Sequence, residues 1–284
     1  MIAKRCLSAS ARIERLLYQD ILSSLPLPAL QCYGVVQDKE AGFHWLFIED
    51  AGTQPYVITS AEHRALSANW LAALHSIRCA DSLIEQLPDR GPGHYLSVLR
   101  SARAQLDQQL VNPFLKGADI SLLETVIGQC DFLEEHWPEL DQLCQEAPRV
   151  LVHGDLVSKN VRVRPETGGL AFLAFDWEKC GWGVPAEDLA FFPDRTINPD
   201  LATYGESVFW QNGVTVQELA DCGIIFRLLD SIDWAASCLV LKSYDDWLSR
   251  PMASLQVYST RLDEIFPSWK WKRASSTLSY TAKG

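Results

Sequence analysis

Apolar segments in the middle of the chain are short and end in polar residues. Residues 150–152 form a continuous apolar run, which is typical of a buried strand, and His153-Gly154-Asp155 follows it directly. Residues 161–164 alternate between apolar and charged side chains, and residues 170–175 are again apolar after a glycine-containing turn. This pattern predicts three strands, and the first and the last of them deliver a carboxylate at their ends, Asp155 and Asp176.

Two carboxylates and one amide are therefore expected close together. Asp155, Asn160 and Asp176 are carried at neighbouring strand ends, from which their side chains can converge. Hard oxygen ligands of this kind suit Mg²⁺, which proteins usually hold with one or two carboxylates while substrate phosphates fill other positions. The pattern thus favours a magnesium site.

The first fifty residues predict a small sheet and one helix. Residues 2–4 form the end of a strand, and apolar residues between positions 13 and 21 recur at helical spacing until Pro26 and Pro28 end the helix. Residues 32–37 and 43–48 then form two strands joined by a turn.

Helices are expected to dominate the remainder. Residues 60–77 begin at a capping serine and present an apolar face, and we expect His75 near the end to be a packed or hydrogen-bonded structural histidine. Residues 81–149 are mainly helical in pattern. Further helices are predicted over residues 199–210, from Thr215 with Glu218 completing a capping box, and over residues 245–266.

Composition limits the class of protein. A chain of 284 residues with 48% hydrophobic content can bury a large core, as one large domain or as two closely packed lobes. No uninterrupted apolar stretch reaches the length of about 18 residues that a membrane span needs, and no apolar segment follows the basic residues at the start as a signal peptide requires. The 8 cysteines form no CxxC pair, so we expect reduced thiols in a cytoplasmic protein.

Charge argues against one class of partner. The formal net charge of −11 disfavours nonspecific binding of nucleic acid, which needs clustered lysine and arginine. The same balance favours a cationic substrate by electrostatic steering.

The motif around Asp155 resembles a known family. The pattern His153-x-Asp155-x-x-x-x-Asn160 is similar to the catalytic loop of protein-kinase-like enzymes, in the form HGDLVSKN that resembles the aminoglycoside phosphotransferase and choline kinase superfamily. The later segment FDWEKCGWGVPAEDLA resembles the metal-binding motif of the same family. Two segments match in order and at suitable separation, which makes the compound motif much more specific than His-x-Asp alone.

The resemblance implies a role for each matching residue. Asp155 corresponds to the catalytic base or hydroxyl-orienting carboxylate, and Asn160 and Asp176 correspond to the Mg²⁺ ligands. Asp188 corresponds to a buried brace of the catalytic loop. Glu178 is an additional candidate for a metal or substrate contact.

The resemblance also suggests a nucleotide site near the start of the chain. Lys4 would contact the nucleotide phosphates and pair with Glu14, as in a kinase-like N-lobe. The segment LFIED resembles the hinge between lobes, so the main chain from Glu49 to Ala51 is the candidate for binding the adenine edge. Lys159, four residues after Asp155, is either a phosphate contact or a lysine that faces solvent.

We therefore expect an α+β fold of the bilobal protein-kinase type, with a truncated small N-lobe over residues 1–50 and a mostly helical C-lobe over residues 51–284 that carries the catalytic loop. The implied function is an ATP- or GTP-dependent phosphotransferase, a kinase acting on a hydroxyl of a small molecule such as an aminoglycoside or related antibiotic. Choline, another amino alcohol or a sugar is the alternative acceptor. Mg²⁺ and the nucleotide are the implied cofactor and co-substrate.

Two other classes stay open from the sequence. One is a nucleotide-binding pseudokinase that acts as an interaction module. The other is a metal-dependent hydrolase using His153, Asp155 and Asp176 as ligands, although hydrolytic metal sites usually recruit more histidine and carboxylate ligands.

The sequence departs from the family at its start. Kinase-like N-lobes place two strands and a phosphate-covering loop before the strand that bears the lysine, yet only three residues precede Lys4. We expect either that the natural start lies upstream or that another element covers the phosphates. An unpaired sheet edge at residues 1–4 would also favour a homo-oligomer.

Overall fold

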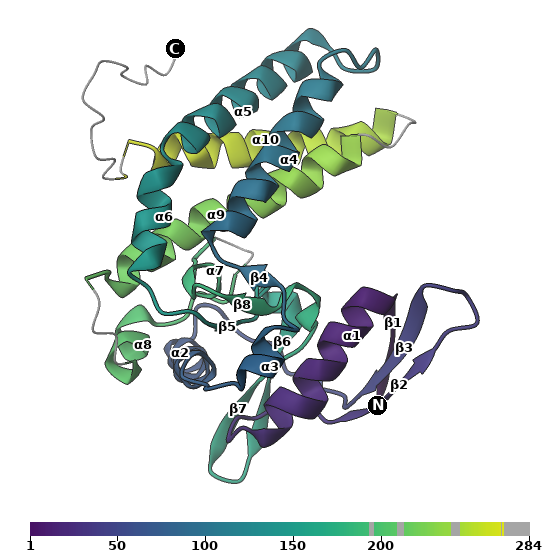
Figure 1. Ribbon diagram of the computed structural model, residues 1–284, viewed down its shortest axis with the longest axis vertical. Helices are drawn as coiled ribbons and strands as arrows, with labels where there is room; N and C mark the ends of the chain where they lie inside the picture. Colours follow the sequence, from purple (N-terminus) through teal and green to yellow (C-terminus); the bar gives the residue numbers. More distant parts are fainter. Residues whose placement is uncertain (193–195, 209–212, 240–244, 268, 270–284) are drawn as a thin grey trace. The chain divides into compact units, whose positions relative to one another are not determined.

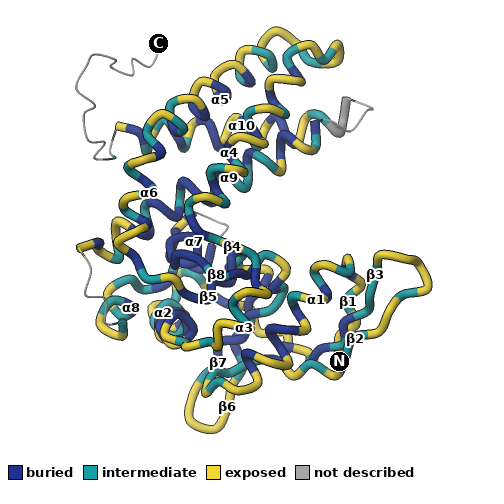
Figure 2. The backbone as a smooth tube through the Cα atoms, in the orientation of Figure 1, coloured by how far each residue is buried: buried dark blue, intermediate teal, exposed yellow. Residues whose placement is uncertain are grey.

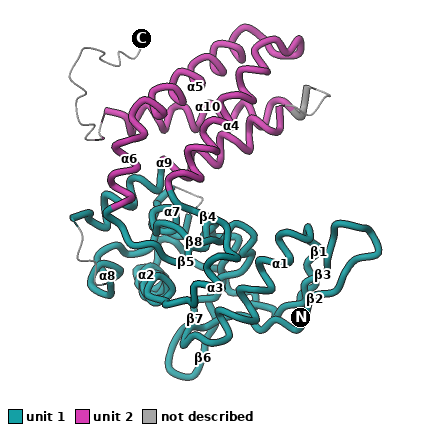
Figure 3. Tube along the Cα trace, in the orientation of Figure 1, with its two compact units in different colours: residues 1–91, 146–224 teal, residues 92–145, 225–284 magenta. Residues whose placement is uncertain are grey.

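A computed structural model describes residues 1–192, 196–208, 213–239, 245–267 and 269. The chain forms two compact units, one of residues 1–91 with 146–224 and the other of residues 92–145 with 225–284 (Figure 3). Each unit is therefore built from two separate stretches of sequence. The division into lobes at residue 50 stays a prediction.

The first unit begins with a three-stranded antiparallel sheet. Its strands are β1 (Ile2–Leu7), β2 (Cys32–Gln37) and β3 (Phe43–Ile48), in the order β1-β3-β2. The prediction for β2 and β3 is confirmed, whereas the prediction that the first strand ends at residue 4 is wrong. The strand continues to Leu7 because residues 5–7 also pair with β3, and among the described residues β1 lies at an edge of the sheet.

One helix packs against this sheet (Figure 1). The helix α1 (Ser8–Leu16) contacts all three strands, and a π-helical turn, η1 (Leu17–Ile21), and a 3₁₀ turn, η2 (Leu22–Ser24), continue it. The sequence predicted a single helix ending before Pro26. The π-helical turn was not predicted, because a change from α-helical to π-helical hydrogen bonding over five residues does not alter the spacing of apolar residues enough to be recognised.

A second helix and a small sheet form the centre of the first unit. The helix α2 (Ala61–His75) begins where predicted, because the hydroxyl of Ser60 accepts a bond from the main-chain N–H of His63. The predicted strand β5 (Val150–Val152) is present and fully buried (Figure 2), and it pairs with β8 (Gly181–Gly183), which pairs in turn with β4 (Asp89–Arg90). The short helix α3 (Asp81–Ile84) precedes β4.

The predicted hairpin in the middle of the chain is confirmed. It consists of β6 (Val161–Glu166) and β7 (Gly169–Ala174), which pair in antiparallel register from Val161 opposite Ala174 onward. The inward side chains of the hairpin, such as Val163 and Phe172, are almost fully buried. This burial fixes the register, since a shift of one residue would turn every apolar side chain outward.

Helices complete the first unit. They are α7 (Ala186–Leu189), α8 (Leu201–Ser207) and the first turns of α9 (Val216–Leu239). The capping box predicted for α9 is present, because the carboxylate of Glu218 accepts a bond from the main-chain N–H of Thr215 at 2.9 Å. The predicted helix over residues 199–210 is shorter than expected, and its last two residues lie outside the described part of the chain.

The second unit is helical. It contains α4 (Pro92–Gln109), α5 (Gly117–Glu135), α6 (Trp137–Gln145), the rest of α9, and α10 (Asp245–Ile265). Tyr95 of α4 stacks on Phe226 of α9 with ring centroids 3.9 Å apart. Within the described residues, no helix is long and apolar enough to cross a membrane.

The close approach between α9 and α7 can be tested by substituting the glycine at the contact. A Cβ atom at Gly223 would overlap the carbonyl oxygen of Ala186, whereas a Cβ at Gly128 in α5 would meet no atom within 4 Å. We expect Gly223→Ala to lower the free energy of unfolding by about 1–3 kcal/mol, although alanine is the better helix former. Gly128→Ala is the matched control and should be neutral or stabilising, as measured by urea denaturation. Equal stability of both variants would contradict the described contact.

Candidate active site

The loop after β5 brings together the first two residues of the predicted site. Two turns form it, closed by hydrogen bonds from Val157 N to Asp155 O and from Asn160 N to Val157 O, both 2.9 Å long. The side-chain amide of Asn160 then donates to the carboxylate of Asp155 at 2.8 Å and to its main-chain oxygen at 3.0 Å. Asn160 is buried and Asp155 is partly exposed, so the amide fixes a carboxylate that solvent or a substrate can reach.

Glycine is required between His153 and Asp155. Gly154 has a φ of 75°, and a Cβ atom there would overlap the main-chain oxygen of Lys179. Any other residue would be strained in this left-handed conformation and would push the two loops apart.

Asp188 lies behind the loop that follows β5. Its carboxylate is fully buried and accepts hydrogen bonds from the main-chain N–H groups of His153, at 2.7 Å, and of Gly154, at 2.9 Å. Burial alone would raise the pKa of Asp188, but the hydrogen bond and charge of His75 and the contacts of His153 outweigh it and lower the pKa. The carboxylate is therefore charged and ties the loop to α7.

His75 holds the other side of this carboxylate. Its Nε2 lies 3.3 Å from the Asp188 carboxylate, and its Nδ1 lies 2.8 Å from the hydroxyl of Tyr204. A hydrogen-bonded structural histidine was predicted at this position, but its partners were not. They lie 113 and 129 residues away, and periodicity along the chain carries no signal for such contacts.

His153 links the loop after β5 to the residues that follow β7. The main-chain N–H of Asp155 donates to Nδ1 of His153 at 3.3 Å, and Nε2 donates to the main-chain oxygen of Phe175 at 3.2 Å. Burial lowers the pKa of His153, which agrees with the neutral tautomer that these two contacts require. Its ring also packs on the indole of Trp177, with centroids 4.3 Å apart.

Asp176 stands at the end of β7 in a constrained conformation. Its φ of 68° is left-handed, which is uncommon for a residue other than glycine, and the 3₁₀ turn η4 (Trp177–Lys179) follows at once. The main-chain N–H of Phe175 donates to the main-chain oxygen of Asn160 at 3.0 Å, so the two candidate metal ligands are carried by adjacent strand ends. Strained backbone of this kind is concentrated at functional sites.

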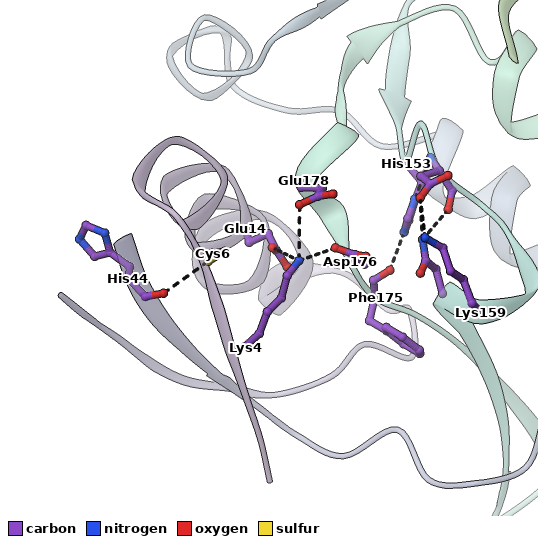
Figure 4. Close-up of polar contacts among 11 residues, drawn as sticks. Lys4, Cys6, Glu14, His44, His153, Lys159, Phe175, Asp176 and Glu178 are labelled. Carbon is purple, nitrogen blue, oxygen red and sulfur yellow. Dashed lines mark hydrogen bonds and ion pairs between the residues drawn. The ribbon is translucent and has the colours of Figure 1, made fainter. Parts of the chain in front are cut away.

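A cluster of charges surrounds Lys4, and we call it the Lys4 cluster (Figure 4). The ammonium of Lys4 lies 2.7 Å from the Glu14 carboxylate, donates a short hydrogen bond to Asp176, and lies 3.9 Å from Glu178. The ion pair between Lys4 and Glu14 was predicted from the family resemblance and is present in the structure. The contact with Asp176, which is 172 residues away, was not foreseen.

Burial and ion pairing act in opposite directions on the pKa values of Lys4 and Glu14. The Glu14 side chain is fully buried, and burial raises its pKa although the ammonium of Lys4 opposes the rise. Burial would lower the pKa of Lys4, but the charge of Glu14 and hydrogen bonds to Asp176 and Glu14 raise it above its ordinary value. Lys4 is therefore a permanent cation.

The predicted hinge residues lie beside the β6–β7 hairpin. The main-chain N–H of Glu49 donates to Gln31 O at 2.8 Å, and its carboxylate accepts from Arg164 at 2.6 Å. Ala51 is buried. Since the N–H of Glu49 is already bonded, the main-chain groups that follow it are the better candidates for the adenine edge.

Lys159 is a peripheral member of the site. Its ammonium lies 3.9 Å from the Asp155 carboxylate, and its side chain is 73% exposed. The exposure fits both readings of this lysine, a phosphate contact and a residue that faces solvent.

The donor set fits magnesium. Asp176 offers a partly exposed carboxylate, and both hydrogen bonds of the Asn160 amide are donated by nitrogen, which leaves the amide oxygen to coordinate. Mg²⁺ needs one or two protein oxygens when substrate phosphates supply the others. No group of three or more histidine, cysteine, aspartate or glutamate residues that would hold a metal by itself occurs among the described residues.

The buried position of Asp188 gives a prediction. We expect Asp188→Ala to lower the free energy of unfolding by about 1–3 kcal/mol, because two buried N–H groups lose their acceptor. Since the folded-state pKa of Asp188 is depressed, its stabilisation is fully present above the unfolded pKa of about 4 and is lost as the pH falls from there through the lower folded-state pKa. Chemical denaturation of both proteins at pH 7 and below pH 4 measures this difference. Normal stability of the variant at pH 7 would remove Asp188 from its bracing position.

Three solved structures resemble this chain in fold. The GDP and kanamycin complex of APH(2")-IIia aligns with a TM-score of 0.61 at 15% identity and covers 89% of this chain and 83% of its own. The ethanolamine kinase of Plasmodium vivax aligns at 0.55 and 18%, with coverage of 88% and 70%. Spectinomycin phosphotransferase APH(9)-Ia, in complex with ADP and spectinomycin, aligns at 0.57 and 15%, with coverage of 90% and 80%. These matches confirm the predicted α+β fold of the protein-kinase type.

Sequence comparison identifies the family. No curated protein matches the chain significantly. A family model described as the phosphotransferase enzyme family matches residues 7–211, a stretch that includes Glu14, Asp155, Asp176 and Asp188 and begins just after Lys4. The prediction of a kinase, a phosphotransferase with an alcohol group as acceptor, is thereby confirmed. On this match the chain belongs to the phosphotransferase enzyme family.

Proposed function

We propose that this protein transfers the γ-phosphoryl group of ATP or GTP to a hydroxyl of a small molecule such as an aminoglycoside or related antibiotic. The observation that carries the proposal is the assembly of Asp155, Asn160, Asp176 and the Lys4–Glu14 pair in one compact unit. Phosphoryl transfer needs positioning and charge neutralisation more than covalent chemistry, and these residues supply both.

Asp155 is the residue that meets the acceptor in this proposal. Its carboxylate accepts the proton of the substrate hydroxyl as that oxygen bonds to the γ-phosphorus and the bond from phosphorus to the β–γ bridging oxygen breaks, which releases ADP or GDP. The Asn160 amide holds the Asp155 carboxylate in place. His153 keeps the loop in register because its two ring nitrogens connect Asp155 N with Phe175 O.

The phosphates are bound by the other half of the site. Mg²⁺ held by Asp176 and Asn160 would neutralise the charge that develops on the transferred group. Lys4 donates to the phosphates, and Glu14 orients its ammonium from the buried side. Glu178, exposed beside Lys4, is a further candidate for a metal or substrate contact.

The acceptor is proposed from charge and from fold neighbours. The net charge of −11 favours a cationic molecule, and the APH(2")-IIia structure contains kanamycin. The likeness to an ethanolamine kinase supports the second candidate, an amino alcohol such as choline, with a sugar as a further alternative. GDP in one neighbour and ADP in another support a nucleotide co-substrate and leave both ATP and GTP in the proposal.

The two other classes considered from the sequence receive less support. A hydrolase that uses His153 as a metal ligand is disfavoured, because both ring nitrogens of His153 are engaged in hydrogen bonds. A pseudokinase is disfavoured because the residues to which the proposal assigns the transfer, Asp155, Asp176 and Lys4, are all present and lie in one compact unit.

Turnover tests the function directly. Purified protein with Mg²⁺ and γ-labelled ATP or GTP should transfer label to at least one member of a panel of aminoglycosides, amino alcohols and sugars. Release of labelled phosphate without transfer would favour a hydrolase. Nucleotide binding with neither release nor transfer would favour a pseudokinase.

The role of Asp155 is tested by its removal. We expect Asp155→Ala to lower the rate of transfer by about 10²–10⁴-fold, the usual contribution of a positioned acid or base. Nucleotide affinity and melting temperature should change little, because Asp155 is partly exposed. A folded variant that keeps more than a tenth of the rate would exclude this role.

The role of Asp176 is tested by binding. Asp176→Asn removes the charged ligand assigned to the metal while keeping the size of the side chain, so the Mg²⁺-dependent part of nucleotide affinity should fall. Calorimetric titration with nucleotide, in the presence and absence of Mg²⁺, measures it. An unchanged dependence on Mg²⁺ would show that the metal is held elsewhere.

A further inference from the structure

The Lys4 cluster contains more negative than positive charge. One ammonium stands among three carboxyl groups, those of Glu14, Asp176 and Glu178, which gives the cluster a formal net charge of −2. Among the ion pairs of the described residues, Lys4 is the cation that serves all three. Figure 4 shows the ammonium at the point where the three acidic side chains converge.

The three contacts differ in how easily they are exchanged. Glu14 is fully buried, so separation from Lys4 would leave an uncompensated charge in the interior. Asp176 is about one quarter exposed and Glu178 about one half, so water or a cation can replace Lys4 at these two carboxylates. The Lys4–Glu14 pair is therefore the fixed part of the cluster, and the contact with Asp176 is the exchangeable part.

Lys4 therefore binds the carboxylate that is assigned to the metal. A direct hydrogen bond from the ammonium occupies Oδ1 of Asp176, and its positive charge would repel a divalent ion at close range. The contact has to be given up, or weakened, when Asp176 coordinates a metal.

We propose that Lys4 is the resident counter-ion of Asp176 and prevents a divalent cation from binding to the nucleotide-free protein. Nucleotide phosphates would offer the ammonium a new acceptor, and Asp176 would become available at the same moment. Metal and nucleotide then bind together, in one exchange of partners around Lys4. This proposal rests on the proposed function, in which Asp176 is the metal ligand.

Metal binding without nucleotide is the direct test, with Mn²⁺ as a paramagnetic probe in place of Mg²⁺. The variant Lys4→Met with Glu14→Gln removes both charges of the fixed pair, so no lone charge is buried and the fold is preserved. Nucleotide-free Mn²⁺ affinity, measured from the electron paramagnetic resonance signal of free Mn²⁺, should rise by about tenfold or more, since a contact charge and a competing hydrogen bond are both lost. The single variant Lys4→Met should show a larger rise if it folds.

Two further variants locate the effect. Adding Asp176→Asn to the double variant should abolish the gain, because the carboxylate that Lys4 released is then missing. Arg5→Met is the matched control, since Arg5 follows Lys4 on the same strand but pairs with Asp38 and Glu40 instead. It should leave Mn²⁺ affinity unchanged.

The outcomes separate this proposal from the function on which it rests. Equal nucleotide-free Mn²⁺ affinity in the wild type and the folded double variant would overturn the counter-ion role, even if Asp176→Asn weakens Mg²⁺-dependent nucleotide binding. A gain that survives Asp176→Asn would also overturn it. If Asp176→Asn leaves the Mg²⁺ dependence of nucleotide binding unchanged, the metal assignment itself fails.

Discussion

One buried carboxylate, which accepts hydrogen bonds from two main-chain N–H groups, holds the site together. Asp188 accepts hydrogen bonds from the main-chain N–H groups of His153 and Gly154, and Nε2 of His75 contacts the same carboxylate. The ring of His153 in turn donates a hydrogen bond to the main-chain oxygen of Phe175. Because Phe175 directly precedes Asp176, the same network also positions Asp176. A buried charge that is fully hydrogen-bonded is costly to disturb, so it specifies one geometry for residues far apart in sequence.

The placement of Asp155, Asn160 and Asp176 was predictable from the sequence because it depends on local patterns. The spacing from His153 to Asn160 and the strand that ends at Asp176 are short-range features, and the structure brings these residues together through adjacent strand ends. The β6–β7 hairpin and the caps of α2 and α9 were predictable for the same reason. Each depends on residues within a few positions of one another.

The missed features depend on contacts that no local pattern encodes. The strands β4 and β8 have two and three residues, too few to show a period of two. The contacts from His75 to Asp188 and from Lys4 to Asp176 cross more than one hundred residues. The extension of β1 to Leu7 is imposed by pairing with β3, since the three residues 5–7 are too few for a strand period of two to show.

The place of Lys4 on β1 gives the two halves of the site unequal resistance to local opening. Asp155 lies on the loop after β5, which the buried Asp188 of α7 holds by two main-chain hydrogen bonds, whereas β1 pairs only with β3 among the described residues. Edge strands exchange their amide hydrogens through small fluctuations that leave the rest of a domain folded. The strand that carries Lys4 can therefore open and re-form while the loop after β5 stays intact, so ligand binding that depends on Lys4 would weaken with temperature before the fold is lost.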